Sequence, residues 1–234
     1  MDDRTLMRLR AETDFTYDAR GRMLQSNEPR AADRRPAPRL WLAWTTTGYV
    51  VRFGAPLPDE IAQRIAAILG RIPPTGDLRA PPAALPELRA ALESHAPITD
   101  ESSGPAYRFP NSIAPAAAAV RITAGNRSIA RETFPWLYDE YADWWPAFAV
   151  IHAGAAVSVC FSSRIGARAC EAGVETLPEF RGHGYAGAVT AAWAAAVQQA
   201  GLTPIYSTSW ENLASQGVAR RVGLTMFAAD VSWM

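Results

Sequence analysis

The feature that most constrains the fold is a strand pattern that runs through a glycine-containing loop into a long helix. Residues 170–178, "CEAGVETLP", are typical of a strand, and "RGHGYA" at 181–186 is typical of a loop. The alanine-rich stretch at 184–200 predicts a helix that ends at Gly201, and "PIYSTSW" at 204–210 predicts a further strand. An alternation of strand and helix of this kind predicts a mixed α/β fold.

The first part of the chain has its own pattern of elements. Apolar alternation on both sides of "TTTG" predicts a hairpin over residues 38–53. Residues 58–70 and 85–95 have the apolar spacing of two helices. The polar stretch at 96–115, punctuated by Pro and Gly, then predicts a break.

We therefore predict a smaller α+β domain over residues 1–112 and an α/β domain with a mixed sheet over 113–234. In the second domain, "RETFPWLYDEYADWW" at 131–145 favours a mostly helical segment. A hairpin around Gly154 follows. After the central unit, a helix over 211–223 and one or two strands close the chain.

The composition argues against several classes of function. The chain has 23 basic and 23 acidic residues and a net charge of zero, so no basic surface for nucleic acid is expected. All the basic residues are arginines, which is typical of a high-GC genome. No apolar run is long enough for a signal peptide or a membrane span, and two cysteines make no disulfide framework. We expect a cytoplasmic protein with no membrane contact and no metal.

The loop at 181–186 has the composition of an anion site. The first turn of a helix has N–H groups without intrahelical partners and carries a partial positive charge. Glycine before the helix lets an anion approach the backbone closely, so a phosphate or pyrophosphate is the expected ligand. The loop is not a phosphate loop of the Gly-Lys-Ser/Thr kind and lacks the glycine pattern of dinucleotide-binding folds.

Two motifs in this region resemble those of the GNAT acyl-CoA N-acyltransferases. Arg181, Gly184 and Ala186 match the family's motif A, (Arg or Gln)-x-x-Gly-x-(Gly or Ala). The motif lies within a stretch of the form E-T-x-x-x-x-R-G-x-G, which is typical of one branch of the family. The downstream segment "WENLASQGVARRVGL" is similar to motif B. The motif B matches are Asn212, Ser215, Arg221, Gly223 and Leu224. The resemblance covers about residues 115–234.

The resemblance implies a cosubstrate, acetyl-CoA, and a sheet with a V-shaped gap between two strands. The CoA pyrophosphate would lie on the loop, the pantetheine arm along the strand before it, and further contacts would come from motif B. The implied CoA-binding residues are Val174, Thr176, Leu177, Arg181, Gly182, His183, Gly184, Tyr185, Ala186, Asn212 and Ser215.

The implied reaction is transfer of an acetyl group from acetyl-CoA directly to an amine of a small molecule or peptide. An alkylammonium cannot attack a thioester, so a base is needed, and the candidates are Glu175 first and Glu171 second. The family often protonates the leaving thiolate with a Tyr, but Ala219 stands at that position here. Ser215, Tyr206 or a water would have to replace it.

Other readings of the sequence stay open at this point. The missing Tyr favours a non-catalytic domain that binds or senses acyl-CoA. The first 112 residues are compatible with a degenerate GNAT-like half or a lid over the substrate, and the chain is compatible with a homodimer. The aromatic residues between 136 and 145 would form either a core stripe or a wall of the acceptor pocket.

Overall fold

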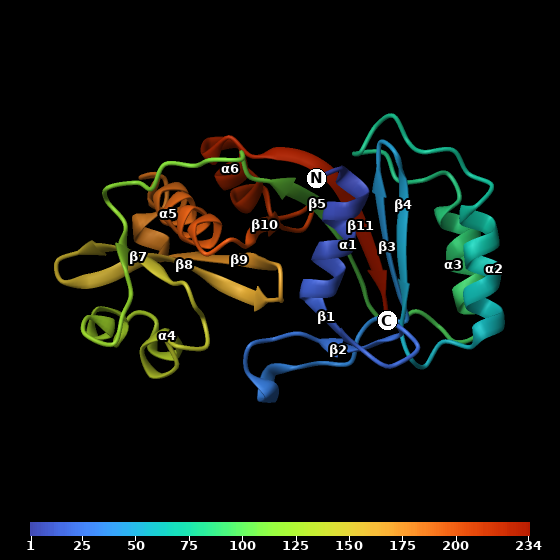
Figure 1. The fold of residues 1–234 in the computed structure, drawn as a ribbon, viewed down its shortest axis with the longest axis horizontal. Coiled ribbons are helices and arrows are strands. Elements are labelled where there is room, and N and C mark those ends of the chain that lie inside the picture. The colour runs from blue at the N-terminus through green and yellow to red at the C-terminus, as the bar shows by residue number, and fades with distance from the viewer.

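A computed structural model describes residues 1–234, which form one nine-stranded mixed sheet, a small two-stranded sheet and six α-helices (Figure 1). The helices are α1 (Asp3–Asp14), α2 (Asp59–Leu69), α3 (Leu85–Glu93), α4 (Pro135–Asp139), α5 (Tyr185–Gln199) and α6 (Leu213–Val222). The first strands are β1 (Phe15–Tyr17), β2 (Met23–Ser26), β3 (Leu40–Thr45), β4 (Gly48–Phe53), β5 (Glu101–Arg108) and β6 (Val120–Arg121). The others are β7 (Phe148–His152), β8 (Ala155–Ile165), β9 (Ala169–Thr176), β10 (Thr203–Ser207) and β11 (Thr225–Trp233). The expectation of a mixed α/β fold is confirmed.

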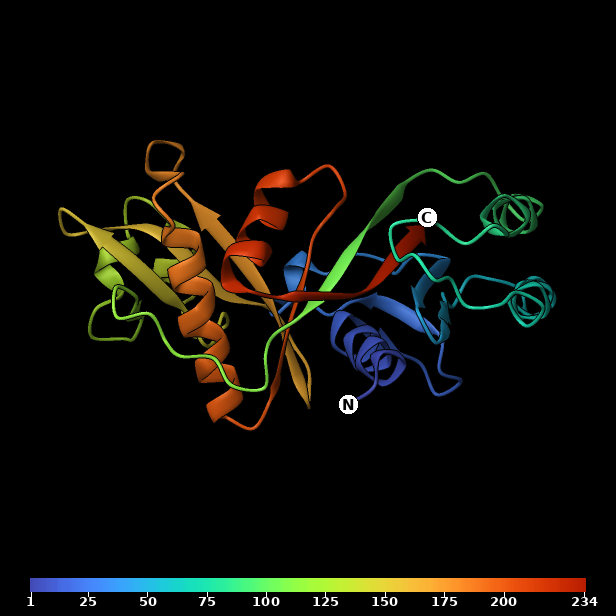
Figure 2. The same ribbon diagram turned by 90° about the horizontal axis from the view of Figure 1, so that it is seen from above.

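The large sheet runs through the whole molecule in the order β4-β3-β11-β5-β10-β9-β8-β7-β6. Figure 2 shows β5 in green and β11 in red crossing the middle of the molecule together, and the two pair antiparallel over most of their length. The last strand of the chain thus lies between β3 and β5. Both predicted domains contribute strands to one sheet, and their division at residue 112 stays a prediction.

Alternating side chains of β3 divide the core at one end of this sheet. Trp41 and Ala43 face helix α1, whereas Leu40, Leu42 and Trp44 face α2 and α3. This alternation follows from the period of two along a strand. The strand is therefore buried on both faces, and α2 and α3 form one end of the molecule in Figure 1.

Helix α1 brings a charged side chain onto the sheet. The Asp2 side chain caps the helix by accepting a hydrogen bond from the Thr5 N–H at 2.9 Å. The helix packs its apolar residues against the sheet, and Arg10 on the same face is 8% exposed. No element was predicted for this segment from the sequence.

The prediction of a break over residues 96–115 is wrong for 101–108, which form the central strand β5. Gly104 and Pro105 suggested a loop, but the glycine has a packing reason. A Cβ at Gly104 would lie 1.8 Å from the carbonyl oxygen of Thr208, so only glycine allows that segment to approach. Pro105 lies just beyond the positions at which β10 pairs with β5.

The prediction of a mostly helical segment at 131–145 is also wrong, because only the five residues of α4 are helical there. Trp136, Trp144 and Phe161 instead form an edge-to-face cluster with ring centroids 4.7–5.3 Å apart. Packing of these rings on β8 outweighs the local preference for helix. The predicted hairpin around Gly154 and the helices at 58–70, 85–95, 184–200 and 211–223 are confirmed.

Candidate active site

Strands β9 and β10 separate after a short parallel pairing. Their pairing ends where Ile205 lies opposite Glu171. Beyond this point β10 pairs with β5, while β9 continues to Thr176 and pairs with β8 alone. The β10-facing edge of residues 172–176 therefore has no strand partner, which leaves a gap between the two strands.

The loop that follows β9 presents unpaired backbone N–H groups to this gap. Gly182 and Gly184 have φ of +82° and +83°, a conformation that glycine adopts without strain. Gly184 directly precedes α5. No backbone carbonyl accepts a hydrogen bond from the N–H groups of residues 182–187. A loop of this kind at a helix N-terminus can bind an anion.

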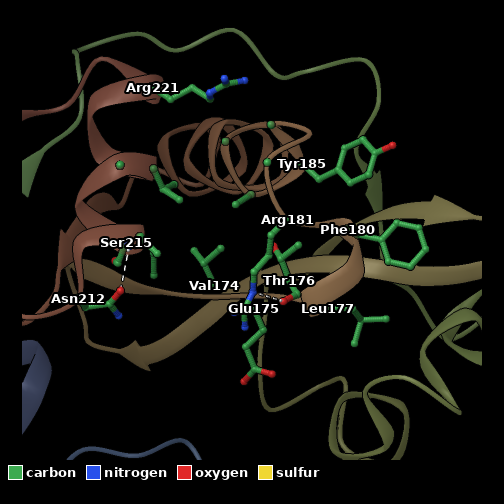
Figure 3. Close-up of a pocket in the computed structure, with 18 of the residues that line it drawn as sticks. Val174, Glu175, Thr176, Leu177, Phe180, Arg181, Tyr185, Asn212, Ser215 and Arg221 are labelled. Carbon is green, nitrogen blue, oxygen red and sulfur yellow. Dashed lines mark hydrogen bonds between the residues drawn. The ribbon is translucent and has the colours of Figure 1, made fainter.

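The gap and the loop line one cavity of about 970 Å³. In Figure 3, β9 crosses this cavity. Helix α5 and the motif B helix α6 lie on one side of the strand, and the side chain of Glu175 lies on the other. Eleven of the residues predicted from the sequence line this cavity: Val174, Glu175, Thr176, Leu177, Arg181, Gly182, Gly184, Tyr185, Ala186, Asn212 and Ser215.

Two predicted residues do not line it. His183 is exposed, its Nδ1 lies 3.0 Å from the carbonyl oxygen of Arg181, and its ring stacks on Tyr185 at 5.5 Å. The side chain of Glu171 lies in a buried ion-pair cluster, with Oε1 3.6 Å from Nε of Arg10 and accepting from the Ser207 hydroxyl. Because this carboxylate is held by other protein groups, we do not assign the base to Glu171.

Glu175 is the carboxylate of the cavity. Its side chain points to the side of β9 opposite α5, as Figure 3 shows. Partial burial raises the pKa of Glu175 above its ordinary value. A raised pKa makes a carboxylate a better proton acceptor at neutral pH.

A tyrosine and a serine form a hydroxyl pair on the other wall. The Tyr206 hydroxyl lies 2.8 Å from the Ser215 hydroxyl, and both residues line the cavity. Burial raises the pKa of Tyr206 to about 12, and the hydrogen bond with Ser215 opposes the shift. Ala219 is fully buried in the apolar core and contributes no polar group.

Asn212 and Arg221 come from the motif B helix. The Asn212 Oδ1 accepts from the Ser215 N–H at 3.0 Å and caps α6. Arg221 reaches across to the loop, where a Cβ on Gly184 would lie 2.5 Å from its Nη1. Arg221 was matched to motif B but not predicted to line the site, because the contact depends on how α6 packs on α5.

Other lining residues were not predicted from the sequence. Thr133 and Phe134 come from the segment before α4, and Ser207 and Thr208 come from the end of β10. No pattern in the sequence links these segments to the loop, because only the fold brings them together. The aromatic side chains between 136 and 145 are absent from the cavity wall.

The comparisons with known proteins agree with this geometry. The family described as GNAT acetyltransferase matches residues 137–228, a range that contains β9, the loop, α5 and α6. This segment belongs to the GNAT superfamily. The matched segment includes every residue that lines the cavity except Thr133 and Phe134, and it does not include helix α1. No curated protein matches the chain significantly.

A solved structure also shows the same fold. A GNAT-family protein from Novosphingobium aromaticivorans superimposes with a TM-score of 0.50 and 15% identity over 86% of each chain. A GCN5-related N-acetyltransferase-like protein from Streptococcus suis gives a TM-score of 0.48 and 16% identity over 85% of each chain. At these identities the likeness concerns the fold alone. None of the helices in Figure 1 is both long and apolar enough to cross a membrane.

Proposed function

We propose that this protein transfers an acetyl group from acetyl-CoA to an amine of a small molecule or peptide. The observation that carries the proposal is the single cavity that joins the unpaired N–H groups of residues 182–187 to the gap between β9 and β10. An elongated thioester with a pyrophosphate at one end suits a cavity with these two features.

The proposed position of acetyl-CoA follows from the charges and donors of the wall. Its pyrophosphate would accept hydrogen bonds from the loop N–H groups, beside the guanidinium of Arg221. Its pantetheine arm would pair with the edge of β9 at Val174 and Thr176, which β10 leaves open, and would pass Leu177, whose N–H already donates to the Val157 carbonyl. The thioester would then lie near Glu175.

The acceptor would approach from the side of β9 to which Glu175 points. Glu175 would remove a proton from the ammonium, directly or through a water, so that the neutral nitrogen can attack the thioester carbon. The new C–N bond forms, the C–S bond breaks, and the nitrogen, which is cationic after the attack, releases its second proton to solvent. The proposed donor to the oxyanion is the N–H group of Thr176, because the Leu177 N–H already donates to the Val157 carbonyl at 3.0 Å. No covalent acyl-enzyme is formed in this sequence.

The departing thiolate would take its proton from the pair Tyr206 and Ser215. This assignment is supported by their 2.8 Å contact and by their place in the cavity wall. The pair would substitute for the tyrosine that the family has at the position of Ala219. A thiol with a pKa near 8.5 is also a tolerable leaving group without help.

The first experiment is a turnover assay with acetyl-CoA and a panel of amines, run beside a thermal-shift titration. A ligand present at about 100 times its Kd adds roughly 2.7 kcal/mol to the free energy of unfolding. For a chain of this length that is a rise in Tm of about 5–10 °C. No shift with millimolar acetyl-CoA would refute the proposal.

The alternative is a domain that binds acetyl-CoA without catalysis. It is favoured by Ala219, which leaves motif B without its usual proton donor. A clear thermal shift with acetyl-CoA but no turnover of any amine would support it. If the Tyr206→Phe variant has an unchanged kcat, the hydroxyl pair is not the proton donor, and the other proposed steps are unaffected.

A further inference from the structure

Two arginine side chains share the cavity of the candidate active site. The charged residues that line the cavity are Glu175, Arg181 and Arg221. Both arginines are exposed at its wall, and neither forms an ion pair with a carboxylate of the protein. Their places differ, because Arg221 lies beside the loop at Gly184, whereas the side chain of Arg181 lies against strand β9.

The side chain of Arg181 is folded back onto the end of β9. Its Nε donates a hydrogen bond to the carbonyl oxygen of Thr176 at 3.3 Å. In Figure 3 the side chain runs from the loop to the strand, where it meets Thr176. The guanidinium of Arg181 therefore lies at the strand, away from the N–H groups of residues 182–187.

The carbonyl of Thr176 belongs to the strand edge that faces the gap. In an antiparallel pair, successive residues direct their N–H and C=O groups alternately toward the partner strand and away from it. The Leu177 N–H donates to the carbonyl of Val157, next to β8, at 3.0 Å. The N–H and C=O groups of Thr176 therefore point away from β8 and into the gap.

Arg181 and the proposed thioester compete for this place. The edge at Thr176 is the one along which the pantetheine arm would pair, and its N–H is the proposed donor to the oxyanion. The N–H and C=O groups of one strand residue are close neighbours on the same edge, so a guanidinium held by the Thr176 carbonyl lies where the thioester would be. The side chain of Arg181 has to leave the strand before acetyl-CoA can bind as proposed.

The pyrophosphate of acetyl-CoA would draw Arg181 away from the strand. Arg181 directly precedes the N–H groups of the loop in the chain, and its exposed side chain can turn toward them by rotation about its own bonds. A guanidinium binds a phosphate through two charge-assisted hydrogen bonds, which are stronger than one bond to a neutral carbonyl. The contact with Thr176 is therefore weak enough for a pyrophosphate to replace it.

We propose that Arg181 determines the specificity for the acyl donor, because it covers the edge of β9 at Thr176 until a thioester with a pyrophosphate draws it to the loop. The proposal rests on the function proposed above, in which acetyl-CoA supplies the pyrophosphate. A pantetheine thioester without phosphate would have to displace the guanidinium from Thr176 and would offer it nothing in return. The cavity thus selects CoA thioesters over shorter pantetheine thioesters by more than the contacts of the pyrophosphate itself.

The test compares acetyl-CoA with S-acetylpantetheine, which has the same thioester and pantetheine arm but no phosphate. Binding to the full chain is measured by titration calorimetry for acetyl-CoA and by ligand-observed NMR for S-acetylpantetheine. Arg181→Ala should bind S-acetylpantetheine at least about threefold more tightly than the wild type, as for one ordinary hydrogen bond that no longer has to be broken. The same variant should bind acetyl-CoA more weakly, so the two affinities change in opposite directions.

Two other arginine variants separate this effect from a change in net charge. Arg221→Ala removes the other guanidinium of the cavity, and it should weaken the binding of acetyl-CoA and leave that of S-acetylpantetheine unchanged. Arg168→Ala removes an exposed arginine in the turn between β8 and β9, outside the cavity wall, and it should change neither affinity. Thermal denaturation establishes that each variant is folded.

Three results would overturn the proposal. The first is an affinity of Arg181→Ala for S-acetylpantetheine that is no higher than that of the wild type, including no binding at all. The second is an equal gain in Arg221→Ala, which would indicate a general effect of charge. The third is an undiminished affinity of Arg181→Ala for acetyl-CoA, because the pyrophosphate would then not be the group that holds Arg181.

The two proposals fail in different ways. If the wild type acetylates amines but Arg181→Ala gains no affinity for S-acetylpantetheine, the acetyltransferase function stands and the role of Arg181 is refuted. If the two affinities of Arg181→Ala change in opposite directions but no amine is acetylated, the role of Arg181 is supported and catalysis is contradicted.

Discussion

Replacing Arg10 by Met should destabilise the protein strongly, because it removes the charge from a buried ion-pair cluster. The guanidinium has three carboxylates within 3.6 Å, and its side chain is only 9% exposed. Met keeps part of the apolar contact of the arginine stem and removes the charge. Breaking a buried ion pair by removing one partner costs about 3–5 kcal/mol, because the other partner is left uncompensated.

Urea denaturation followed by circular dichroism measures this loss at pH 7. A loss of about 3–5 kcal/mol corresponds to a fall in Tm of roughly 6–20 °C for a chain of this length. Arg8→Met on the same helix is the matched control, because Arg8 is exposed and forms no ion pair. The control should stay within about 0.5 kcal/mol of the wild type.

The pH dependence of the loss tests its electrostatic origin. Without Arg10, the pKa values of Asp14, Glu171 and Asp230 in the folded variant rise above their unfolded values. Groups with raised folded pKa values contribute stability at low pH that is lost as pH rises, so the variant's deficit should be small near pH 4 and grow toward pH 7. A deficit below about 1 kcal/mol at pH 7, or one equal at both pH values, would refute the reasoning.

Three further outcomes follow from the site. Gly184→Ala and Gly182→Ala both place an alanine at a strained positive φ, which costs about 1–2 kcal/mol, but only the first crowds Arg221. In calorimetry, Gly184→Ala should therefore weaken CoA binding at least about tenfold more than Gly182→Ala, and equal affinities would mean that the pyrophosphate binds elsewhere. Glu175→Gln should lower kcat at least about tenfold near pH 7 and recover part of it as pH rises and free amine accumulates; a flat, unchanged pH–rate profile would show that Glu175 is not the base. Burial raises the pKa of the Cys170 thiol and the chain has no lysine, so intact-mass spectrometry after incubation with acetyl-CoA alone should show at most one stable acetyl group. Cys170→Ala should stay active, whereas a stoichiometric, hydroxylamine-sensitive acetyl group would indicate a covalent mechanism.

Where structure depends on near neighbours in the chain, the sequence was sufficient to predict it. The strand, loop and helix around Gly184 follow from apolar spacing, from glycine before a helix and from the unpaired N–H groups of its first turn. The same local rules predicted α2, α3, α6 and the hairpin of β7 and β8. Most of the predicted CoA-binding residues line one cavity because they lie on two short, continuous segments.

Tertiary structure alone decided what depends on distant parts of the chain. Gly104 reads as a loop residue until the carbonyl of Thr208 is seen to occupy the space of its missing Cβ. Glu171 and Glu175 are both candidates for the base on the strand, but α1 places Arg10 over the first and leaves the second at the cavity. Local propensity contains no term for such contacts, because the free energy of a buried charge depends on every element packed against it. For that reason the sequence could rank the two glutamates, and only the packing of α1 on the sheet could separate them.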